Sequence, residues 1–450
     1  MEDAHSAEVA RVVVCRSCMN GKHRRLGELI RNAVRLAIVV MMLSMPRWVD
    51  AYSVLSHEAN VDALWDSVIK PLLHQKFPGA TAADLDHARA FTYGGSVIQD
   101  LGYYPFGNQF FSNLVHYVRS GDFVEALLRD ARDLDEYAFA IGALGHYATD
   151  NLGHPIAVNR SVPIMYPKLR AKYGDEVTYA EGPKEHILVE FSFDVVQVAA
   201  GTYAPDAYHR FIGFEVAKPL LERAFRETYG LEVKDLFLDE DLTIGTYRYA
   251  VSHAIPQMTQ VAWHDKHDEI DRLRPGVQQN QFVFNLSRRE YEQEFGTRYK
   301  RPGVFARVLA IVYRLVPKVG PFRVLSYKAP TPEIEKMFLE SFQQARDRFH
   351  QSLDALRAGR LNLTNTDFDT GRPAARGEYQ LADDTYAELV DKLAERGFAG
   401  VPERLRTNIT RFYAALEPRP NESKKDRKRD ARVKQELARL SAASTTSPRR

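Results

Sequence analysis

Histidines and acidic residues recur at helical spacing in two separate segments of the chain. In the segment GHYATDNLGHP, His146, Asp150 and His154 stand four residues apart. Each helical residue advances by about 100°, so positions i, i+4 and i+8 drift by only about 80° and share a face. A second segment, EHILVEF, places His186 and Glu190 four residues apart among apolar residues. Both segments predict helices that carry imidazole and carboxylate groups into an apolar interior.

Buried imidazole and carboxylate groups indicate either a hydrogen-bonded network or a metal site. A buried charge is costly unless it is paired or bound to a metal. One such pair would be explained by hydrogen bonding alone, but five residues on two helices favour a metal. Neutral imidazole and carboxylate are good zinc ligands. The chain has only two cysteines, Cys15 and Cys18, both near its start.

Three further candidates lie upstream of these helices: His57, Asp100 and His116. Taken singly, each has an ordinary explanation, namely a histidine at a helix start, a surface aspartate and a histidine at the core edge. WHDKHDEID adds His264 and His267, but the dense charge around them indicates a solvated face.

The elements that must position these residues are helices, and we expect an all-α fold. Strict alternation of apolar and polar residues is scarce, whereas helix start and stop signals are frequent. Thr81 followed by Asp84 resembles a capping box, and Pro183 stands at a helix start. The helical segments expected are 81–99, 108–121, 133–154, 183–200, 206–275, 331–358 and 381–416, with a loop at 359–380.

Glycines in the first histidine segment also carry information. Gly142, Gly145 and Gly153 each weaken a helix by up to about 1 kcal/mol relative to alanine. Their presence predicts that another backbone or a ligand approaches this helix closely.

The first 51 residues predict a secretory leader, with Met19 as a possible true start. A basic stretch precedes the apolar run LAIVVMMLSM, and Val49 and Ala51 suit the positions before a cleavage site. Tyr52 would then be the first mature residue, and the mature protein would be secreted or periplasmic and free of cysteine. An uncleaved membrane anchor is the alternative, although the run is short for a span of about 20 residues.

Charge is spread unevenly along the chain. Residues 52–418 carry a net charge of −8, which argues against a stable nucleic-acid partner. Residues 419–450 carry +7, and we expect this basic tail to be solvated and mobile. We divide the chain into the leader 1–51, a helical domain 52–280, a helical extension 281–418 and the tail 419–450.

The ordered set of candidates resembles the zinc-dependent phospholipase C family, which shares an all-α, three-zinc fold with fungal single-strand-specific nucleases. The resemblance covers roughly 52–200 and, more loosely, the helices to about 270. It consists of a free amino terminus followed by His57, Asp100, His116, His146, Asp150, His154, His186 and Glu190. The family members most similar in pattern place the histidine corresponding to His154 ten residues after the first rather than eight, and they begin with Trp rather than Tyr.

The resemblance implies three Zn²⁺ ions and a ligand set for each of them. One zinc would take Asp100, His116, His146 and Asp150. A second would take His57, the amino nitrogen and carbonyl oxygen of Tyr52, and Asp150 as a bridge. The third would take His154, His186 and Glu190. Asp100 and Asp150 are the expected catalytic carboxylates, and a hydroxide held between two zincs would attack a phosphodiester.

The sequence indicates the substrate, a phosphodiester, less clearly than it indicates the metal ligands. The aromatic segment GYYPFGNQFF, residues 102–111, fits a substrate cleft or the core. The segment 302–324 fits a helix at a lipid surface, making peripheral membrane contact, or a buried helix with snorkelling cations. We predict phospholipase C-type cleavage of a phospholipid. A single-strand nuclease on the same site and a non-catalytic metal-binding envelope protein are the alternatives.

Overall fold

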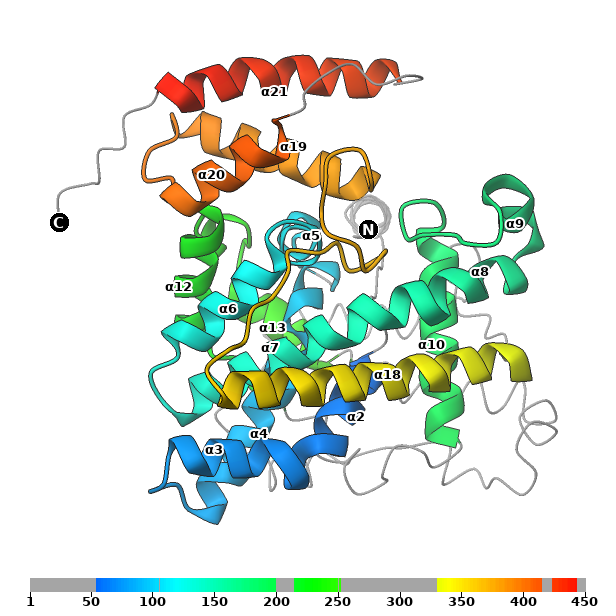
Figure 1. The fold of residues 1–450 in the computed structure, drawn as a ribbon, viewed down its shortest axis with the longest axis vertical. Helices are drawn as coiled ribbons and strands as arrows, with labels where there is room; N and C mark the ends of the chain where they lie inside the picture. Colours follow the sequence, from blue (N-terminus) through cyan, green and yellow to red (C-terminus); the bar gives the residue numbers. More distant parts are fainter. Residues whose placement is uncertain are drawn as a thin grey trace, which may run out of the picture. The chain divides into compact units, whose positions relative to one another are not determined.

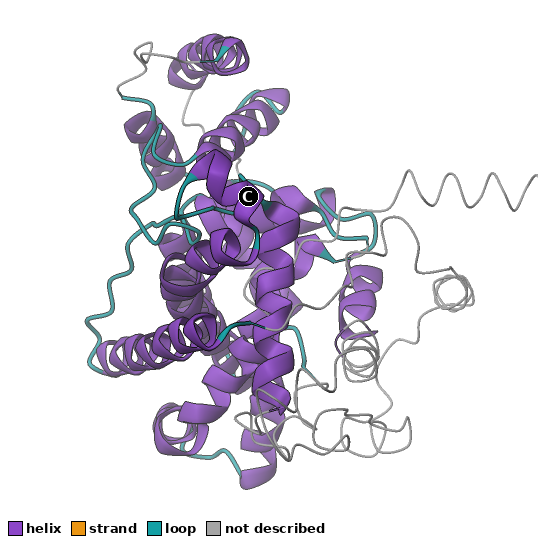
Figure 2. Cartoon of the chain, turned by 90° about the vertical axis from the view of Figure 1, so that its right-hand side faces the viewer, coloured by secondary structure: helices purple, strands orange, loops and turns teal. Residues whose placement is uncertain are grey.

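The computed structural model describes residues 54–104, 106–199, 214–249, 251, 330–414 and 423–442. Within these ranges the chain forms helices joined by loops, and the only extended pairing is an isolated bridge between Thr366 and Pro373. Figure 2 shows the helices in purple and their connections in teal. The predicted all-α fold is confirmed.

The helices fall into two stretches of sequence (Figure 1). The first stretch contains α2 (Val54–Leu64), α3 (Lys70–Lys76), α4 (Ala82–Val97), α5 (Gln109–Tyr117), α6 (Ser120–Asp130), α7 (Leu134–Gly153), α8 (Asn159–Met165), α9 (Pro167–Tyr173) and α10 (Pro183–Ala199). The second contains α12 (Lys218–Tyr229), α13 (Glu240–Tyr249), α18 (Pro332–Arg357), α19 (Gln380–Glu395), α20 (Glu403–Phe412) and α21 (Lys424–Ala442).

Side-chain caps define several helix starts. Thr81 and Asp84 form the predicted capping box of α4, and Asp133 caps α7 by accepting from the backbone N–H of Glu136. The expected end of a helix at Gly121 is wrong, because α5 ends at Tyr117 and Gly121 lies in the first turn of α6. Arg119, in a left-handed conformation at φ 51°, makes the break between these two helices.

Helix α7 ends at Gly153, before Pro155 as the sequence predicts. The chain then continues through a π-helical turn at His154–Val158 into α8. Pro155 has no N–H to donate to the carbonyl of Asn151, so the regular α-helical ladder cannot continue there. A π turn of this kind rotates the residues that follow it relative to α7.

Helices α4 and α7 pack against each other backbone to backbone. A Cβ atom on Gly142 would lie 2.0 Å from the carbonyl oxygen of Thr92, and one on Gly95 would lie 1.8 Å from that of Phe139. No side chain larger than hydrogen fits at these two positions. The close backbone approach predicted from Gly142 is confirmed, and it brings the histidines of α7 next to α4.

One hydrophobic core includes residues from both stretches of helices. Phe349 and Leu353 of α18, Phe368 of the following loop and Tyr386 of α19 are buried in the same cluster as Phe139 of α7. Helix α18, yellow in Figure 1, runs beside α7 and packs against it. The segment 381–416, expected to be helical, forms two helices, α19 and α20, separated at Gly397 and Gly400, which have φ of 62° and 70°.

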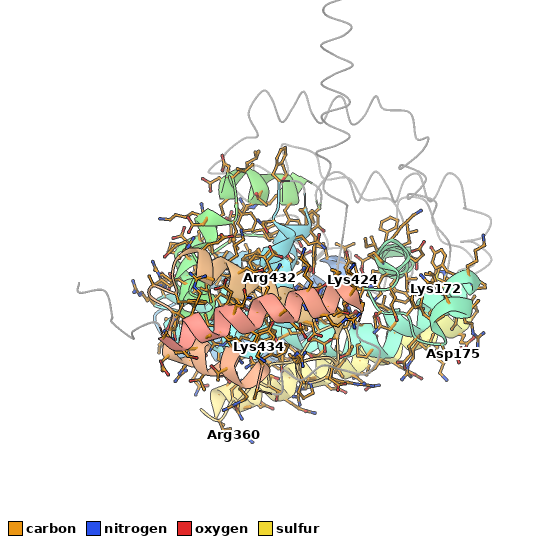
Figure 3. All side chains as sticks on the ribbon, turned by 90° about the horizontal axis from the view of Figure 1, so that it is seen from above. Lys172, Asp175, Arg360, Lys424, Arg432 and Lys434 are labelled. Carbon is orange, nitrogen blue, oxygen red and sulfur yellow. The ribbon has the colours of Figure 1, made fainter. Side chains whose placement is uncertain are left out.

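The expectation of a mobile basic tail is wrong for residues 424–442, which form α21 and pack against α19. Val433 and Leu440 are buried in this contact, and the guanidinium of Arg429 lies 2.5 Å from a carboxylate oxygen of Asp384. The buried apolar residues and the ion pair hold α21 against α19, while most basic residues of α21 face solvent. Figure 3 labels Lys424, Arg432 and Lys434 along its outer side.

Several predictions fall on residues outside the described ranges. These are the leader 1–51 with Cys15, Cys18 and Tyr52, the domain boundary near 280, the segment 302–324, and His264 and His267. Among the helices that are described, none has the length and apolar character needed to cross a lipid bilayer.

Candidate metal centre

The carboxylate of Asp150 lies between imidazoles from three different helices. Its Oδ2 is 3.0 Å from Nε2 of His146 and 3.4 Å from Nε2 of His116, and its Oδ1 is 3.3 Å from Nε2 of His57. Asp100, from the 3₁₀ turn Ile98–Tyr103 after α4, places its Oδ1 3.3 Å from Nε2 of His116. These residues form two adjoining groups that can each hold a metal ion.

We name these groups after one member each. The Asp100 group comprises Asp100, His116 and His146, and the His57 group comprises His57, His146 and Asp150. Within each group the ligand atoms lie within 4.8 Å of one another, and every residue is buried. The two groups have His146 in common, and its ring stacks on that of His57 with centroids 4.1 Å apart.

A third group is formed where α7 passes into its π turn and meets α10. This Glu190 group comprises His154, His186 and Glu190. Nδ1 of His186 lies 2.8 Å from Oε1 of Glu190, and Nε2 of His154 lies 3.9 Å from the same oxygen. Nε2 of His154 is also 3.7 Å from Oδ1 of Asp150, so the Glu190 group adjoins the other two.

Hydrogen bonds to backbone carbonyls fix the tautomers of two of these histidines. Nδ1 of His116 lies 2.8 Å from the carbonyl oxygen of Ser112, and Nδ1 of His146 lies 2.9 Å from that of Ser96. A carbonyl oxygen can only accept, so each Nδ1 carries the hydrogen. In the neutral rings, both Nε2 atoms therefore point lone pairs toward the Asp150 carboxylate and, at 3.4 Å, toward each other.

This arrangement fits a cation between the acceptor atoms. Lone pairs that face carboxylate oxygens repel unless a proton or a metal ion lies between them. Two imidazole nitrogens and two carboxylates form a donor set that suits zinc. The chemistry of the residues present therefore fits the predicted metal.

The pKa values of His116 and Asp150 show that these sites favour a positive charge beside the carboxylates. Burial lowers the pKa of His116, but hydrogen bonds and charge from Asp100 and Asp150 outweigh burial and raise it to about 9. Burial raises the pKa of Asp150, but His146, His154 and His57 outweigh burial and hold it well below its usual range. Asp150 is accordingly ionised at neutral pH.

The described structure brings together all the predicted ligands except Tyr52, which lies outside it. His154, eight residues after His146, is the first residue of the π turn, and its Nε2 lies 3.9 Å from Oε1 of Glu190. The aromatic segment 102–111 is largely core. Tyr104 stacks on Tyr247 at 3.6 Å between ring centroids, and the buried Tyr103 lies 5.6 Å from the ring of His116.

Asp369, in the loop between α18 and α19, also lies at this centre, although it is not among the residues predicted from the sequence. Its buried carboxylate lies 3.2 Å from Nδ1 of His154 and 3.4 Å from Nε2 of His186. The neighbouring Phe368 packs edge-on against the ring of His116, with centroids 5.2 Å apart. The only available signal was the sequence TDFDT, an acidic pair around an aromatic residue in an otherwise turn-rich loop.

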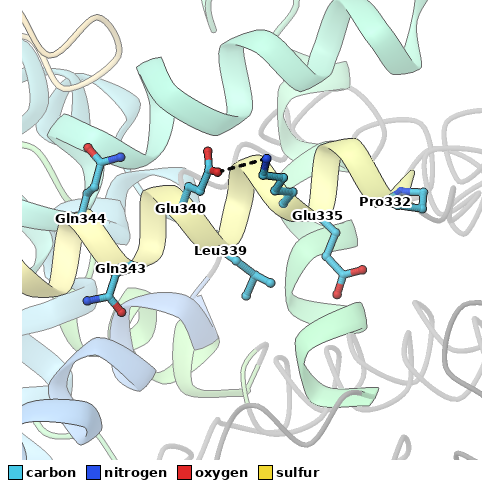
Figure 4. A pocket seen from close by; sticks show the side chains of 7 residues that line it. Pro332, Glu335, Leu339, Glu340, Gln343 and Gln344 are labelled. Carbon is cyan, nitrogen blue, oxygen red and sulfur yellow. Dashed lines mark ion pairs between the residues drawn. The ribbon is translucent and has the colours of Figure 1, made fainter.

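A shallow groove lies along α18, away from the histidines (Figure 4). It has a volume of about 590 Å³ and is lined by Pro332, Glu335, Lys336, Leu339, Glu340, Gln343 and Gln344. Lys336 and Glu340, four residues apart on α18, form an ion pair at 3.7 Å. The groove contains no histidine and no residue of the three groups, so it is not the candidate centre.

A helical domain with three adjoining histidine–carboxylate groups is typical of proteins with a multinuclear metal centre. A family model described as zinc dependent phospholipase C matches residues 61–238. This match supports the resemblance to the zinc-dependent phospholipase C family that the motifs indicate, and the family is one of zinc-dependent hydrolases. His57 and Asp369 lie outside the matched range. Comparison with curated proteins and with solved structures gives no significant match.

Proposed function

We propose that the protein is a zinc-dependent phosphodiester hydrolase that cleaves a phospholipid in the manner of a phospholipase C. The proposal rests mainly on the position of the Asp150 carboxylate. Its Oδ2 faces His116 and His146, whereas its Oδ1 faces His57. A carboxylate in this position can bridge two metal ions, which is a common arrangement in enzymes that hydrolyse phosphate esters.

The residues divide into three zinc sites in this proposal. Asp100, His116, His146 and Asp150 hold one ion. His57 and Asp150 hold a second, together with the amino nitrogen and carbonyl oxygen of Tyr52 once the leader has been removed. His154, His186 and Glu190 hold the third.

The protein's own residues set up the chemistry at this centre. When bound, zinc supplies Lewis acidity, which acidifies water and neutralises charge on a phosphate group. Asp100 and Asp150 are the proposed catalytic carboxylates, because they place negative charge where the ions must be held close together. The hydrogen bonds from Nδ1 of His116 and Nδ1 of His146 to backbone carbonyls keep both rings oriented, so that their Nε2 atoms are the ones available for ligation.

A phospholipid is the proposed substrate because of the charge of the chain. Residues 52–418 carry a net charge of −8, which disfavours a nucleic-acid strand. The apolar, basic segment 302–324 is the proposed membrane contact. Secretion or export to the periplasm is proposed from the leader-like residues 1–51, which would also free the amino group of Tyr52.

The experiment compares two substrates with zinc-loaded protein that begins at Tyr52. Hydrolysis of a chromogenic phosphocholine ester, with no digestion of single-stranded DNA, would support the proposal. Digestion of DNA alone would indicate the nuclease instead. Loss of both activities in protein that carries its full zinc would indicate a non-catalytic metal-binding protein. The same protein with one extra residue before Tyr52 is the matched control, and we expect it to bind less zinc.

A further inference from the structure

The loop that follows α18 reaches the Glu190 group from the side opposite to Glu190. Oδ1 of Asp369 lies 3.2 Å from Nδ1 of His154 and 3.4 Å from Nε2 of His186. These are the two nitrogens that do not face Glu190, whose Oε1 is near Nε2 of His154 and Nδ1 of His186. A single carboxylate oxygen thus lies behind both imidazoles of the group.

The tautomer of His186 can be deduced from its neighbour Asn159. The side-chain amide nitrogen of Asn159 lies 2.7 Å from the backbone carbonyl oxygen of Asp369, which can only accept. The amide group of Asn159 must therefore direct its oxygen the other way, where it lies 2.8 Å from Nε2 of His186. Since that oxygen also only accepts, Nε2 of His186 carries the hydrogen and Nδ1 is left as a lone pair toward Glu190.

The tautomer of His154 follows in the same way. Its Nδ1 faces the carboxylate of Asp369, which can only accept when ionised, so this nitrogen carries the hydrogen. Oδ2 of Asp369 accepts from the backbone N–H of Tyr179 and the hydroxyl of Tyr379, and Nε2 of His186 brings a hydrogen to Oδ1, so both oxygens act as acceptors. Nε2 of His154 is then a lone pair directed at the space between Asp150 and Glu190.

Asp369 is itself held firmly in place. Its Oδ2 accepts hydrogen bonds from the backbone N–H of Tyr179 at 2.8 Å and from the hydroxyl of Tyr379 at 2.5 Å. Two residues further on, Gly371 has φ of 68° and no room for a Cβ, which would lie 2.5 Å from the carbonyl oxygen of Asn151 in α7. The loop therefore lies directly on the helix that carries His154.

We infer that Asp369 is a positioning residue for a metal ion at the Glu190 group, contributed by the C-terminal region rather than by the matched family domain. Its carboxylate and its backbone carbonyl, acting through Asn159, fix both imidazoles so that Nε2 of His154 and Nδ1 of His186 face the ion. Such partners behind a ligand typically change metal affinity by about 10- to 100-fold. The inference rests on the proposed function, because it concerns the same centre.

The test measures zinc binding to Asp369→Asn at a series of buffered free zinc concentrations, with metal content determined by elemental analysis. We expect one of the three zinc ions to bind about 10- to 100-fold more weakly, and the other two to change little. Asn159→Ala should weaken the same ion, since it removes the amide oxygen that accepts from Nε2 of His186. Asp367→Asn is the matched control, because Asp367 accepts from Thr370 and does not touch either histidine.

A second readout separates positioning from loss of fold. Long-range ¹H–¹⁵N spectra of the metal-free wild-type protein should show hydrogen on Nδ1 of His154 and on Nε2 of His186. Zinc bound by Asp369→Asn with wild-type number and affinity would overturn the inference and leave the proposed function intact, as would the opposite tautomers. A wild-type protein that binds no zinc would overturn both.

Discussion

Asp150 is the residue on which the centre depends most, because each of its oxygens faces a different group of imidazoles. Four histidine nitrogens lie 3.0–3.7 Å from its carboxylate. The side chain is fully buried, so these imidazoles and any bound ions determine the environment of its charge. Removal of this charge should therefore affect more than one ion.

The first prediction concerns Asp150→Asn. An amide places a donor where an anionic oxygen now faces imidazole, so at least one zinc ion should be lost and hydrolysis should fall below about 1% of wild type. Far-UV circular dichroism should keep its helical form. Elemental analysis checks the metal content. Asp135→Asn, which makes the same substitution in the first turn of the same helix, is the control. Wild-type zinc content in Asp150→Asn would refute the bridging role.

A second prediction at this scale concerns Glu240, whose side chain lies 3.6 Å from Lys218. Burial raises the pKa of Glu240 to about 7, assisted by Glu222 and Asp241 and only partly opposed by Lys218. The folded protein then binds more protons than the unfolded chain between about pH 4.5 and 7, so this group lowers stability as pH rises through that window.

Glu240→Gln should flatten this part of the pH profile. Above pH 7 the variant should be more stable than wild type by up to about 3 kcal/mol, and below pH 4.5 the difference should disappear. Urea unfolding at several pH values measures the effect. A constant difference between variant and wild type across the whole range would contradict the assigned pKa.

At the scale of elements, the contact between α4 and α7 determines whether the ligands can meet. α7 carries His146, Asp150 and the start of the π turn, and Asp100 follows α4 directly. The backbone contact at Gly142 fixes the distance between the two helices. The geometry of the centre therefore depends on Gly142, which has no side chain and cannot itself bind a metal ion.

Gly142→Ala should be destabilising although alanine favours helices. Its Cβ would meet the carbonyl oxygen of Thr92 at 2.0 Å, and overpacking of this kind costs about 1–3 kcal/mol. Zinc affinity should fall with it as the helices separate. Gly79→Ala is the control, because a Cβ there meets nothing within 4 Å. Thermal unfolding should show a lower Tm for Gly142→Ala alone, and equal Tm values would contradict this account.

Helical periodicity and caps were sufficient to predict much of this architecture. The capping box at Thr81 and the cap at Asp133 depend on residues three positions apart, so a sequence displays them directly. The π turn at His154 was not predicted, because Pro155 indicates only that a regular helix is interrupted. Asp369 was missed because its partner His154 lies 215 positions away, and no periodicity connects a loop to a helix.

At the scale of the whole molecule, the C-terminal helices support the loop that carries Asp369. Arg376 of this loop pairs with Asp430 of α21, and Asp383 of α19 accepts from the backbone N–H of Gly377. Arg429 of α21 pairs with Asp384 at 2.5 Å and lies 3.6 Å from Asp383. The contacts of α21 thus extend, through two ion pairs and a hydrogen bond, to the loop beside the histidines.

Arg429→Met should loosen α21 from α19. The guanidinium is 8% exposed, pairs with Asp384 and Asp426 and lies 3.6 Å from Asp383, so its loss removes a cation that carboxylates of α19 and α21 share. Hydrogen exchange should become faster in 424–442 and in the loop around Asp369, while α7 keeps its protection. Arg427→Met, at an exposed position of the same helix, should leave exchange unchanged. Unaltered exchange in Arg429→Met would show that α21 is held by its apolar contacts alone.

The proposed metal centre is tested most directly by anomalous diffraction at the zinc edge from crystals of the protein that begins at Tyr52. We predict three zinc peaks, one beside Asp100 and His116, one beside His57, and one between His154, His186 and Glu190. Asp150 should contact the first two. Peaks elsewhere on the protein, or no peak among these buried histidines in zinc-saturated crystals, would contradict this prediction.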